Sequence, residues 1–343
     1  MKLYVDIEKR LGDFKLKIKF ETDKEVFSII GASGSGKTMT LKCIAGIENP
    51  DKGTIRLGER ILFDSATGIN RPPQKRRIGY IFQDYALFPN MTVTENIMCG
   101  AMDPDITANY IEKFFLKGKE HLYPAQLSGG EKQRVAIARM LSAKPELIMF
   151  DEPFNALDNY LKSNLEMEIH DAIESYNGQA LFVSHDRDEV YRLTDQIAVM
   201  EKGHLIEVGP KVELFNNPQS LAAALLTGCK NISSVERKED GTLWAKDWAM
   251  KLKIAEFDGE MPRYVGFRAH HFEVTKEMHE YNVVPCKIKR VVEDTFEILV
   301  KFESAEGYIM TYALPKEKWA QLKVQEGNIY LKMPENKIMI FER

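Results

Sequence analysis

A glycine-rich segment near the N-terminus carries the clearest chemistry in the sequence. Residues 31–38 read Gly-Ala-Ser-Gly-Ser-Gly-Lys-Thr, which fits the pattern GxxxxGK[ST] after a strand and before a helix. The glycines let successive backbone N–H groups face an anion, and the helix N-terminus adds partial positive charge. Lys37 can reach the β- and γ-phosphates of a nucleotide, and Thr38 can ligate Mg²⁺. The predicted phosphate-binding residues are Gly31, Ser33, Gly34, Ser35, Gly36, Lys37 and Thr38.

Two acidic residues follow a continuous apolar run. Residues 147–150 read Leu-Ile-Met-Phe, and Asp151 and Glu152 come directly after them. Open α/β sheets place ligands at the carboxyl ends of their strands. Asp151 therefore suits the Mg²⁺ shell, directly or through water, and Glu152 suits a general base for the attacking water. Two surface acids after a strand are a common arrangement, but their occurrence together with the phosphate loop favours catalysis.

A third candidate catalytic residue, His185, ends a second apolar run, 180–183. A single histidine is more often structural than catalytic. If this strand lies in the same sheet, however, His185 can reach a γ-phosphate from the same edge. We interpret it as a phosphate sensor that helps to hold the attacking water.

The apolar runs also predict the elements that position these residues. Val26–Ile30 is a short apolar strand, Thr38–Ala45 is helical, and continuous apolar strands are typical of a parallel sheet covered by helices. Residues 1–228 are therefore predicted to form an α/β domain. Residues 231–343 are predicted to form a small, mostly β domain. Its clearest strand is an alternation in which Phe296, Ile298, Val300 and Phe302 face the core.

Composition limits the remaining possibilities. The 343 residues are 44% hydrophobic, and two domains are expected at roughly 100–200 residues each. The net charge of −4 argues against a nucleic-acid partner. The four cysteines are widely spaced, so we expect reduced cytosolic thiols and no zinc site. Because neither a signal peptide nor an apolar run of ~18 residues is visible, any membrane-spanning partner is expected to be a separate chain.

A second glycine-containing segment brings a family resemblance. Residues 127–134 read Leu-Ser-Gly-Gly-Glu-Lys-Gln-Arg, which resembles the signature of ATP-binding cassette (ABC) proteins. Ser128 and the amides of Gly129 and Gly130 can form an anion cradle at a helix start. This cradle lacks a lysine and a metal ligand. The resemblance implies that it completes the ATP site of a second copy, so that a homodimer holds ATP between two chains.

Further segments match the ABC family in order along residues 1–228, and the interval 84–135 corresponds to its helical subdomain. Gln83 resembles the glutamine that links the γ-phosphate and Mg²⁺ to the membrane subunits, and it is therefore both a catalytic and a metal candidate. Residues 155–158 resemble the loop that crosses the dimer interface and include the ATP-site candidate Asp158, with Asn155 where serine is more usual. Phe14 is the candidate for stacking on adenine, with an ordinary strand phenylalanine as the alternative.

A separate cassette followed by a small β domain resembles ABC importers more than exporters. The resemblance implies an ATP-hydrolysing subunit at the cytoplasmic face of the membrane, with two integral-membrane permease subunits and, indirectly, a solute-binding protein. Residues 64–80 and 129–134 resemble the ATPase of molybdate and tungstate importers. Sulfate or another small solute (a sugar, iron or a polyamine) is the alternative cargo. A soluble ABC ATPase of translation or DNA repair, and a non-hydrolysing scaffold, are the alternatives in other functional classes.

The C-terminal region resembles the accessory domain of such importers, an oligonucleotide-fold-like module called TOBE. Val265–His270 is similar to a segment in which the family usually reads Gly-hydrophobic-Arg-Pro-Glu, although Ala269 and His270 replace its last two residues. In some relatives this domain binds the imported oxyanion and inhibits transport. Feedback inhibition is therefore one hypothesis, and a domain that only extends the dimer interface is the alternative.

Overall fold

The structure, a computed structural model, describes residues 2–23, 26–82, 84–154, 159–174, 176, 178–239, 241–254, 261–275, 277, 279, 281–304, 306–321 and 329–342. Its internal contacts divide the chain into two compact units, Met1–Lys211 and Val212–Arg343. The domain boundary near 228–231 remains a prediction from the sequence. Within the described ranges, no helix is long and apolar enough to span a membrane.

In the N-terminal unit, eleven strands of the described residues form one sheet in the order β6-β5-β4-β1-β2-β11-β10-β3-β9-β8-β7. Their bounds are β1 Leu3–Leu11, β2 Phe14–Thr22, β3 Val26–Gly31, β4 Lys52–Leu57, β5 Arg60–Asp64, β6 Ile69–Asn70, β7 Ile78–Ile81, β8 Leu147–Asp151, β9 Gln179–Ser184, β10 Gln196–Glu201 and β11 His204–Pro210. Strands β10, β3, β9, β8 and β7 run parallel, whereas β6, β5, β4, β1 and β2 are antiparallel. The predicted parallel sheet is thus present, with an antiparallel extension.

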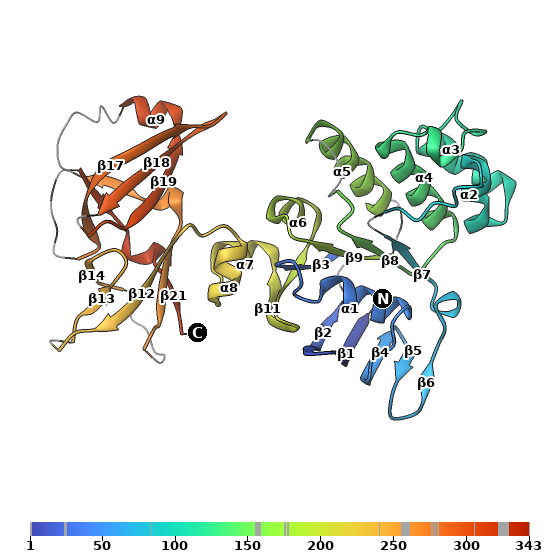
Figure 1. Cartoon of the computed structure of the whole chain (residues 1–343), viewed down its shortest axis with the longest axis horizontal. Helices are drawn as coiled ribbons and strands as arrows, with labels where there is room; N and C mark the ends of the chain where they lie inside the picture. Colours follow the sequence, from blue (N-terminus) through green and yellow to red (C-terminus); the bar gives the residue numbers. More distant parts are fainter. Residues whose placement is uncertain are drawn as a thin grey trace. The chain divides into compact units, whose positions relative to one another are not determined.

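The helices of this unit are α1 Lys37–Ala45, α2 Val93–Ala101, α3 Pro104–Lys113, α4 Gly129–Ser142, α5 Asn159–Glu174 and α6 Arg187–Leu193, with short helical turns η1 Pro73–Lys75 and η2 Pro124–Gln126. Helices α2, α3, α4 and α6 begin with a side-chain cap. The Thr92 side chain accepts from Glu95 N while Glu95 caps Thr92 N in return. Such a capping box satisfies two of the amides that a helix start leaves unpaired. Helices α2, α3 and α4 lie together in Figure 1. Helix α2 packs against α4.

The parallel strands are buried on both faces, and this explains their uninterrupted apolar sequences. On β8, Ile148 and Phe150 join a core that includes α4, whereas Leu147 and Met149 join a second core that includes α1. Successive strand residues point to opposite faces, so one strand supplies both cores. Each buried side chain of this size contributes ~1.5–3 kcal/mol to stability. The sheet is the middle layer that holds the loops at its edge in place.

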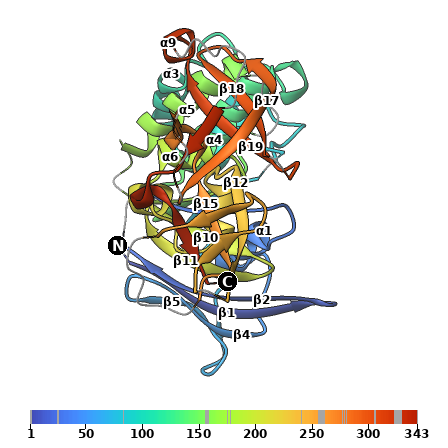
Figure 2. The same ribbon diagram turned by 90° about the vertical axis from the view of Figure 1, so that its left-hand side faces the viewer.

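The C-terminal unit contains two five-stranded sheets, ordered β14-β13-β12-β15-β21 and β16-β20-β17-β18-β19. The strands are β12 Asn231–Arg237, β13 Leu243–Ala245, β14 Met250–Leu252, β15 Tyr264–Phe267, β16 Glu273–Thr275, β17 Val283–Glu293, β18 Glu297–Ser304, β19 Ile309–Pro315, β20 Ile329–Lys332 and β21 Met339–Phe341. The helical segments are α7 Lys211–Asn216, α8 Leu221–Leu226, η3 Ala269–His271, α9 Lys316–Gln321 and η4 Glu335–Lys337. Figure 2 shows β17, β18 and β19 as neighbours, in line with their antiparallel pairing.

The prediction of a β-rich C-terminal region is correct, but the prediction that Phe296 faces its core is wrong. On β18, Ile298, Val300 and Phe302 are buried, as the alternation indicated. Phe296 precedes the strand, lies in the turn after β17, and is 86% exposed. The pleat that directs alternate residues inward requires strand pairing, and at Phe296 the chain is turning between two strands.

Candidate active site

The phosphate loop joins β3 to α1, as its sequence predicts. Gly36 is the N-cap of α1 and has a φ of 110°, in the left-handed region that disfavours side chains. At Gly31 a Cβ atom would lie 2.4 Å from the backbone oxygen of Met200 and 2.7 Å from Ser35 Oγ. Glycine at these two positions is therefore a requirement of the loop geometry.

The ammonium group of Lys37 lies inside the phosphate loop, close to backbone oxygens of that loop. Lys37 is 4% exposed, and its Nζ donates to the oxygen of Gly31 at 2.7 Å and of Ala32 at 3.1 Å. Burial lowers the pKa of Lys37, and the nearby carboxylates of Glu152 and Asp151 oppose that shift. The hydroxyl of Ser35 is also buried and has no hydrogen-bond partner in the described part of the chain. A buried cation and an unsatisfied hydroxyl fit a phosphate ligand.

Asp151 lies beside Thr38, at the carboxyl end of β8. Thr38 Oγ1 donates to Asp151 Oδ1 at 2.9 Å, and the Tyr80 hydroxyl donates to Asp151 Oδ2 at 2.8 Å. A hydroxyl and a carboxylate are hard oxygen ligands that suit Mg²⁺, which takes its remaining ligands from phosphates and water. Among the described residues, no group of three or more His, Cys, Asp or Glu side chains is arranged to hold a metal ion.

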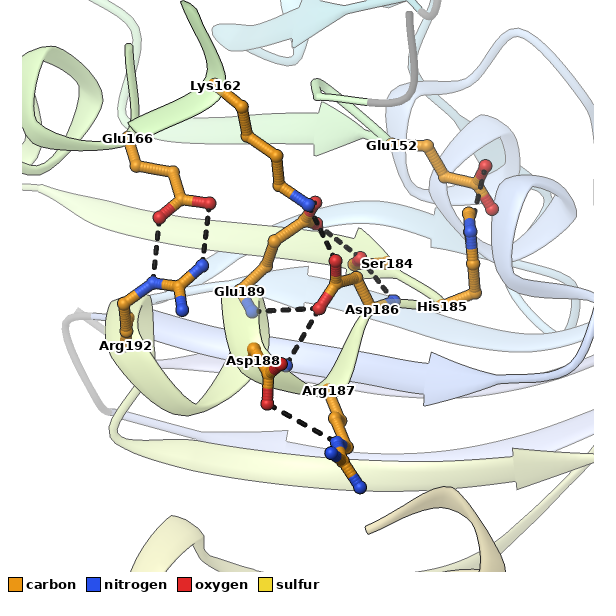
Figure 3. Close-up of polar contacts among 10 residues, drawn as sticks. All are labelled: Glu152, Lys162, Glu166, Ser184, His185, Asp186, Arg187, Asp188, Glu189 and Arg192. Carbon is orange, nitrogen blue, oxygen red and sulfur yellow. Dashed lines mark hydrogen bonds and ion pairs between the residues drawn. The ribbon is translucent and has the colours of Figure 1, made fainter. Parts of the chain in front are cut away.

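Glu152 and His185 face each other across the ends of β8 and β9 (Figure 3). His185 Nδ1 lies 3.5 Å from Glu152 Oε2, and Lys37 Nζ lies 3.7 Å from Glu152 Oε1. The backbone of Glu152 has a φ of 49°, which is uncommon for a residue with a side chain. Its N–H donates to the oxygen of Val183 at 2.9 Å, and this bond holds the strained turn in place. Strain of this kind is characteristic of functional sites.

Phe14 begins β2 and packs against the phosphate loop. A Cβ atom placed on Gly36 would lie 3.0 Å from Phe14 Cζ. The ring is half-buried and belongs to the margin of the core that includes α1. Phe14 therefore has an aromatic surface at the start of the helix that follows the phosphate loop, where a base could stack.

The signature segment opens α4, with Ser128 as its N-cap. Glu131 N donates to Ser128 Oγ at 3.4 Å, and Glu131 Oε2 accepts from Ser128 N at 2.7 Å. Gly129 and Gly130 form the first turn of this helix, and a Cβ on Gly130 would meet no atom within 4 Å. The first backbone amides of α4 therefore lie at a helix start, and the space beside Gly130 is open. An anion cradle needs this geometry, because the anion must approach the amides closely.

A buried glutamine on the same helix connects α4 to the turn after Glu152. Gln133 is 0% exposed, and its Nε2 donates to the oxygen of Pro153 at 3.1 Å. Its Oε1 accepts from the Tyr85 hydroxyl at 2.9 Å. Arg139, further along α4, donates to the oxygens of Tyr85 and Ala86 at 3.2 and 2.9 Å. Helix α4 thus contacts both the turn after Glu152 and the segment after residue 83.

Comparison with known proteins agrees with this geometry. Residues 15–155 match the family described as ABC transporter. The Molybdate/tungstate import ATP-binding protein WtpC of Pyrococcus horikoshii is 35% identical over 356 residues, covering 98% of each chain. This chain belongs to the ABC transporter ATP-binding proteins. The Molybdenum import ATP-binding protein ModC of Paramagnetospirillum magneticum is 40% identical, over 63% of this chain and 61% of that protein's length.

A solved structure matches part of this ABC protein. A dimeric ATP-binding cassette in a post-hydrolysis state, MJ0796 bound to ADP and Pi, aligns with a TM-score of 0.53 and 25% identity. The alignment covers 62% of this chain and 99% of that one. The predicted P-loop NTPase fold of ABC ATPases, followed by a further β-rich region, is confirmed.

Not every residue implied by the ABC resemblance can be placed. Gln83 and Asp158, together with the rest of 155–158, lie outside the described residues. No individual role was predicted from the sequence for Tyr80 or Gln133. Tyr80 could have been noticed because it lies near the end of an apolar strand, but its contact with Asp151 depends on β7 lying next to β8. Nothing in the local sequence marks Gln133 as a link between two loops.

Proposed function

We propose that this chain is an ATPase subunit that drives import through a separate membrane permease. The observation that carries this proposal is the convergence of Lys37, Thr38, Asp151, Glu152 and His185 at one edge of the parallel sheet. A phosphate loop by itself supports nucleotide binding. The addition of a carboxylate and an imidazole 3.5 Å apart supports hydrolysis.

Each residue of this group has a chemical role suited to its position. Gly31, Ser33, Gly34, Ser35 and Gly36 present the backbone of the phosphate loop. Lys37, now bonded to loop oxygens, exchanges those partners for phosphate oxygens, and its positive charge offsets the charge that develops there. Thr38 and Asp151 would hold Mg²⁺. When bound, this ion would neutralise charge on the β- and γ-phosphates.

Glu152 is the proposed general base, and His185 orients the water beside the γ-phosphate. The carboxylate of Glu152 lies between Lys37 and His185, so its two oxygens face a cation and an imidazole. A water between Glu152 and the phosphate would lose its proton to the carboxylate as it attacks. The Gln83 side chain is proposed to complete this arrangement and to contact Mg²⁺, and Phe14 to stack on adenine.

The site needs a second copy of the chain to be complete. Ser128, Gly129 and Gly130 offer amides and a hydroxyl at the start of α4 but no lysine and no metal ligand. We assign this cradle, with Asp158, to the ATP held by the phosphate loop of the partner. ATP binding then favours a closed homodimer, and hydrolysis reopens it. Because ligand and conformation are linked, the permease subunits can respond to that closure.

The proposed cargo is molybdate or tungstate, because the relative that matches almost the whole chain bears the name of a molybdate/tungstate import protein. Sulfate or another small solute is the alternative. The chain would then act at the cytoplasmic face of the membrane with two permease subunits, and a solute-binding protein would deliver the ion to them. The cradle of Ser128, Gly129 and Gly130 and the proposed ATPase chemistry do not depend on which ion is carried.

Two experiments test this function at separate levels. Phosphate release from MgATP by the purified chain should be measurable and should be lost in Lys37→Ala, whereas equal rates in both would refute the ATPase assignment. Cells whose own copy carries Lys37→Ala should lose uptake of radiolabelled molybdate and tungstate but retain uptake of sulfate. Loss of sulfate uptake with intact molybdate uptake would support the alternative cargo.

A further inference from the structure

The turn that holds His185 is enclosed by a ring of polar contacts (Figure 3). Ser184 Oγ donates to Glu189 Oε2 at 2.6 Å and accepts from the backbone N–H of Asp186 at 2.9 Å. Lys162 Nζ closes the ring, at 2.6 Å from Asp186 Oδ2 and 2.6 Å from Glu189 Oε1. Both chain neighbours of His185 are therefore members of a single closed network.

The ring leaves these side chains little freedom. Asp186 uses its other oxygen, Oδ1, to accept from the backbone N–H groups of Asp188 and Glu189 at 2.8 and 3.3 Å, which caps α6. Ser184 is 3% exposed and Glu189 is 4% exposed. Burial raises the pKa of the Glu189 carboxyl, and Lys162 and Ser184 act against that shift. A buried carboxylate needs such partners to remain charged.

Lys162 is the ring member that comes from a different element. It lies in the first turns of α5, whereas the other three members lie between the end of β9 and α6. Helix α5 has a second link to α6, because Arg192 Nε and Nη2 donate to Glu166 at 2.7 and 2.8 Å. Of these two links, the one made by Lys162 reaches a residue that flanks His185, and the one made by Arg192 does not.

We propose that Lys162 is a positioning residue, which sets the place of the His185 imidazole relative to Glu152 by joining α5 to the turn at 184–186. This inference rests on the function proposed above, in which these two residues surround the attacking water. His185 and Glu152 come from the ends of different strands, and their 3.5 Å separation depends on how the turn is held. Catalytic groups displaced by ~1 Å can lose up to ~10²-fold in rate.

The kinetic test compares two links between the same two helices. Lys162→Met removes the link that includes the His185 turn, and Arg192→Met removes the link that does not. We expect Lys162→Met to lower kcat for ATP hydrolysis by about tenfold or more with KM for ATP nearly unchanged. Arg192→Met should keep the wild-type kcat, and Lys162→Arg should recover most of it. An equal loss of kcat in Lys162→Met and Arg192→Met would overturn the proposal, because it would indicate helix packing alone.

A spectroscopic test does not depend on hydrolysis. The chain has seven histidines, and the imidazole nitrogen signals of His185 can be assigned by their loss in His185→Ala. Lys162→Met should shift those signals, whereas Arg192→Met should leave them unchanged; unchanged signals in Lys162→Met would refute the positioning role. Ser184→Ala opens the ring at a neutral residue and serves the same purpose if Lys162→Met does not fold. If the wild-type chain released no phosphate, the proposed ATPase function would fail, yet this signal would still decide the role of Lys162.

Discussion

Substituting Tyr80 by phenylalanine tests how this protein holds Asp151, the proposed Mg²⁺ ligand. The Tyr80 hydroxyl donates to Asp151 Oδ2 at 2.8 Å, while Thr38 donates to Oδ1. Burial first, and then the charge of Asp151, raises the pKa of Tyr80, so the phenol keeps its proton and remains the donor. Removing the hydroxyl leaves the rest of the ring in place and frees one oxygen of the carboxylate.

The size of the effect follows from the type of bond. Hydrogen bonds that orient a metal ligand typically contribute ~10–100-fold to metal affinity. A hydrogen bond to a charged group contributes ~1.5–3 kcal/mol to stability, and ~1.4 kcal/mol corresponds to a tenfold change in an equilibrium constant. The Mg²⁺ concentration that gives half-maximal ATPase activity should therefore rise about tenfold or more in Tyr80→Phe.

The assay needs a direct reading of the metal and a matched control. Mn²⁺ can replace Mg²⁺ in the presence of ATP, and electron paramagnetic resonance then reports the free and bound ion. Tyr110→Phe is the control, because its hydroxyl donates to the oxygen of Leu141 at 3.3 Å and reaches no proposed metal ligand. Both variants should lose some stability, but only Tyr80→Phe should weaken metal binding. Unchanged Mn²⁺ affinity in Tyr80→Phe would refute the role given to this hydroxyl.

Two further predictions concern stability. Gln133→Leu leaves the Tyr85 hydroxyl and the Pro153 oxygen unpaired and should lower the free energy of unfolding by ~1–3 kcal/mol. In urea unfolding, the double variant Gln133→Leu/Tyr85→Phe should lose less free energy of unfolding than the sum of the two single losses. Fully additive losses would argue against the hydrogen bond between these two side chains. Burial lowers the pKa of His271 from its ordinary 6.5 to about 4, so the unfolded chain binds this proton more readily and stability should fall as pH drops from about 6.5 towards 4. His271→Gln should reduce that loss, as measured by Tm against pH, and an identical pH dependence in both proteins would contradict the assignment.

The local sequence was sufficient to predict the phosphate loop and the strand ends. Gly31–Lys37 must curl between a strand and a helix, and the apolar run before Asp151 indicates a strand buried on both faces. These features depend on nearest neighbours and on burial, which sequence patterns record well. The confirmed fold of the N-terminal unit follows from the same patterns.

Contacts between distant elements could not be predicted in this way. Tyr80 meets Asp151 because β7 pairs with β8, and Lys162 meets Asp186 because α5 packs beside α6. Neither pairing is encoded in the spacing of residues along the chain. Phe296 shows the opposite error, since the alternating pattern begins in the turn that precedes β18, before strand pairing starts. The pattern marks apolar residues but does not mark where strand pairing stops.

Glu152 is the proposed base for ATP hydrolysis in this protein. Its carboxylate has one oxygen near Lys37 and the other near His185, and glutamine keeps its shape while removing its basicity. The most direct measurement is the rate of phosphate release from MgATP by the wild-type chain and by Glu152→Gln. We expect a rate at least about 10²-fold lower in the variant, with ATP binding retained. Near-normal turnover in Glu152→Gln would contradict this role.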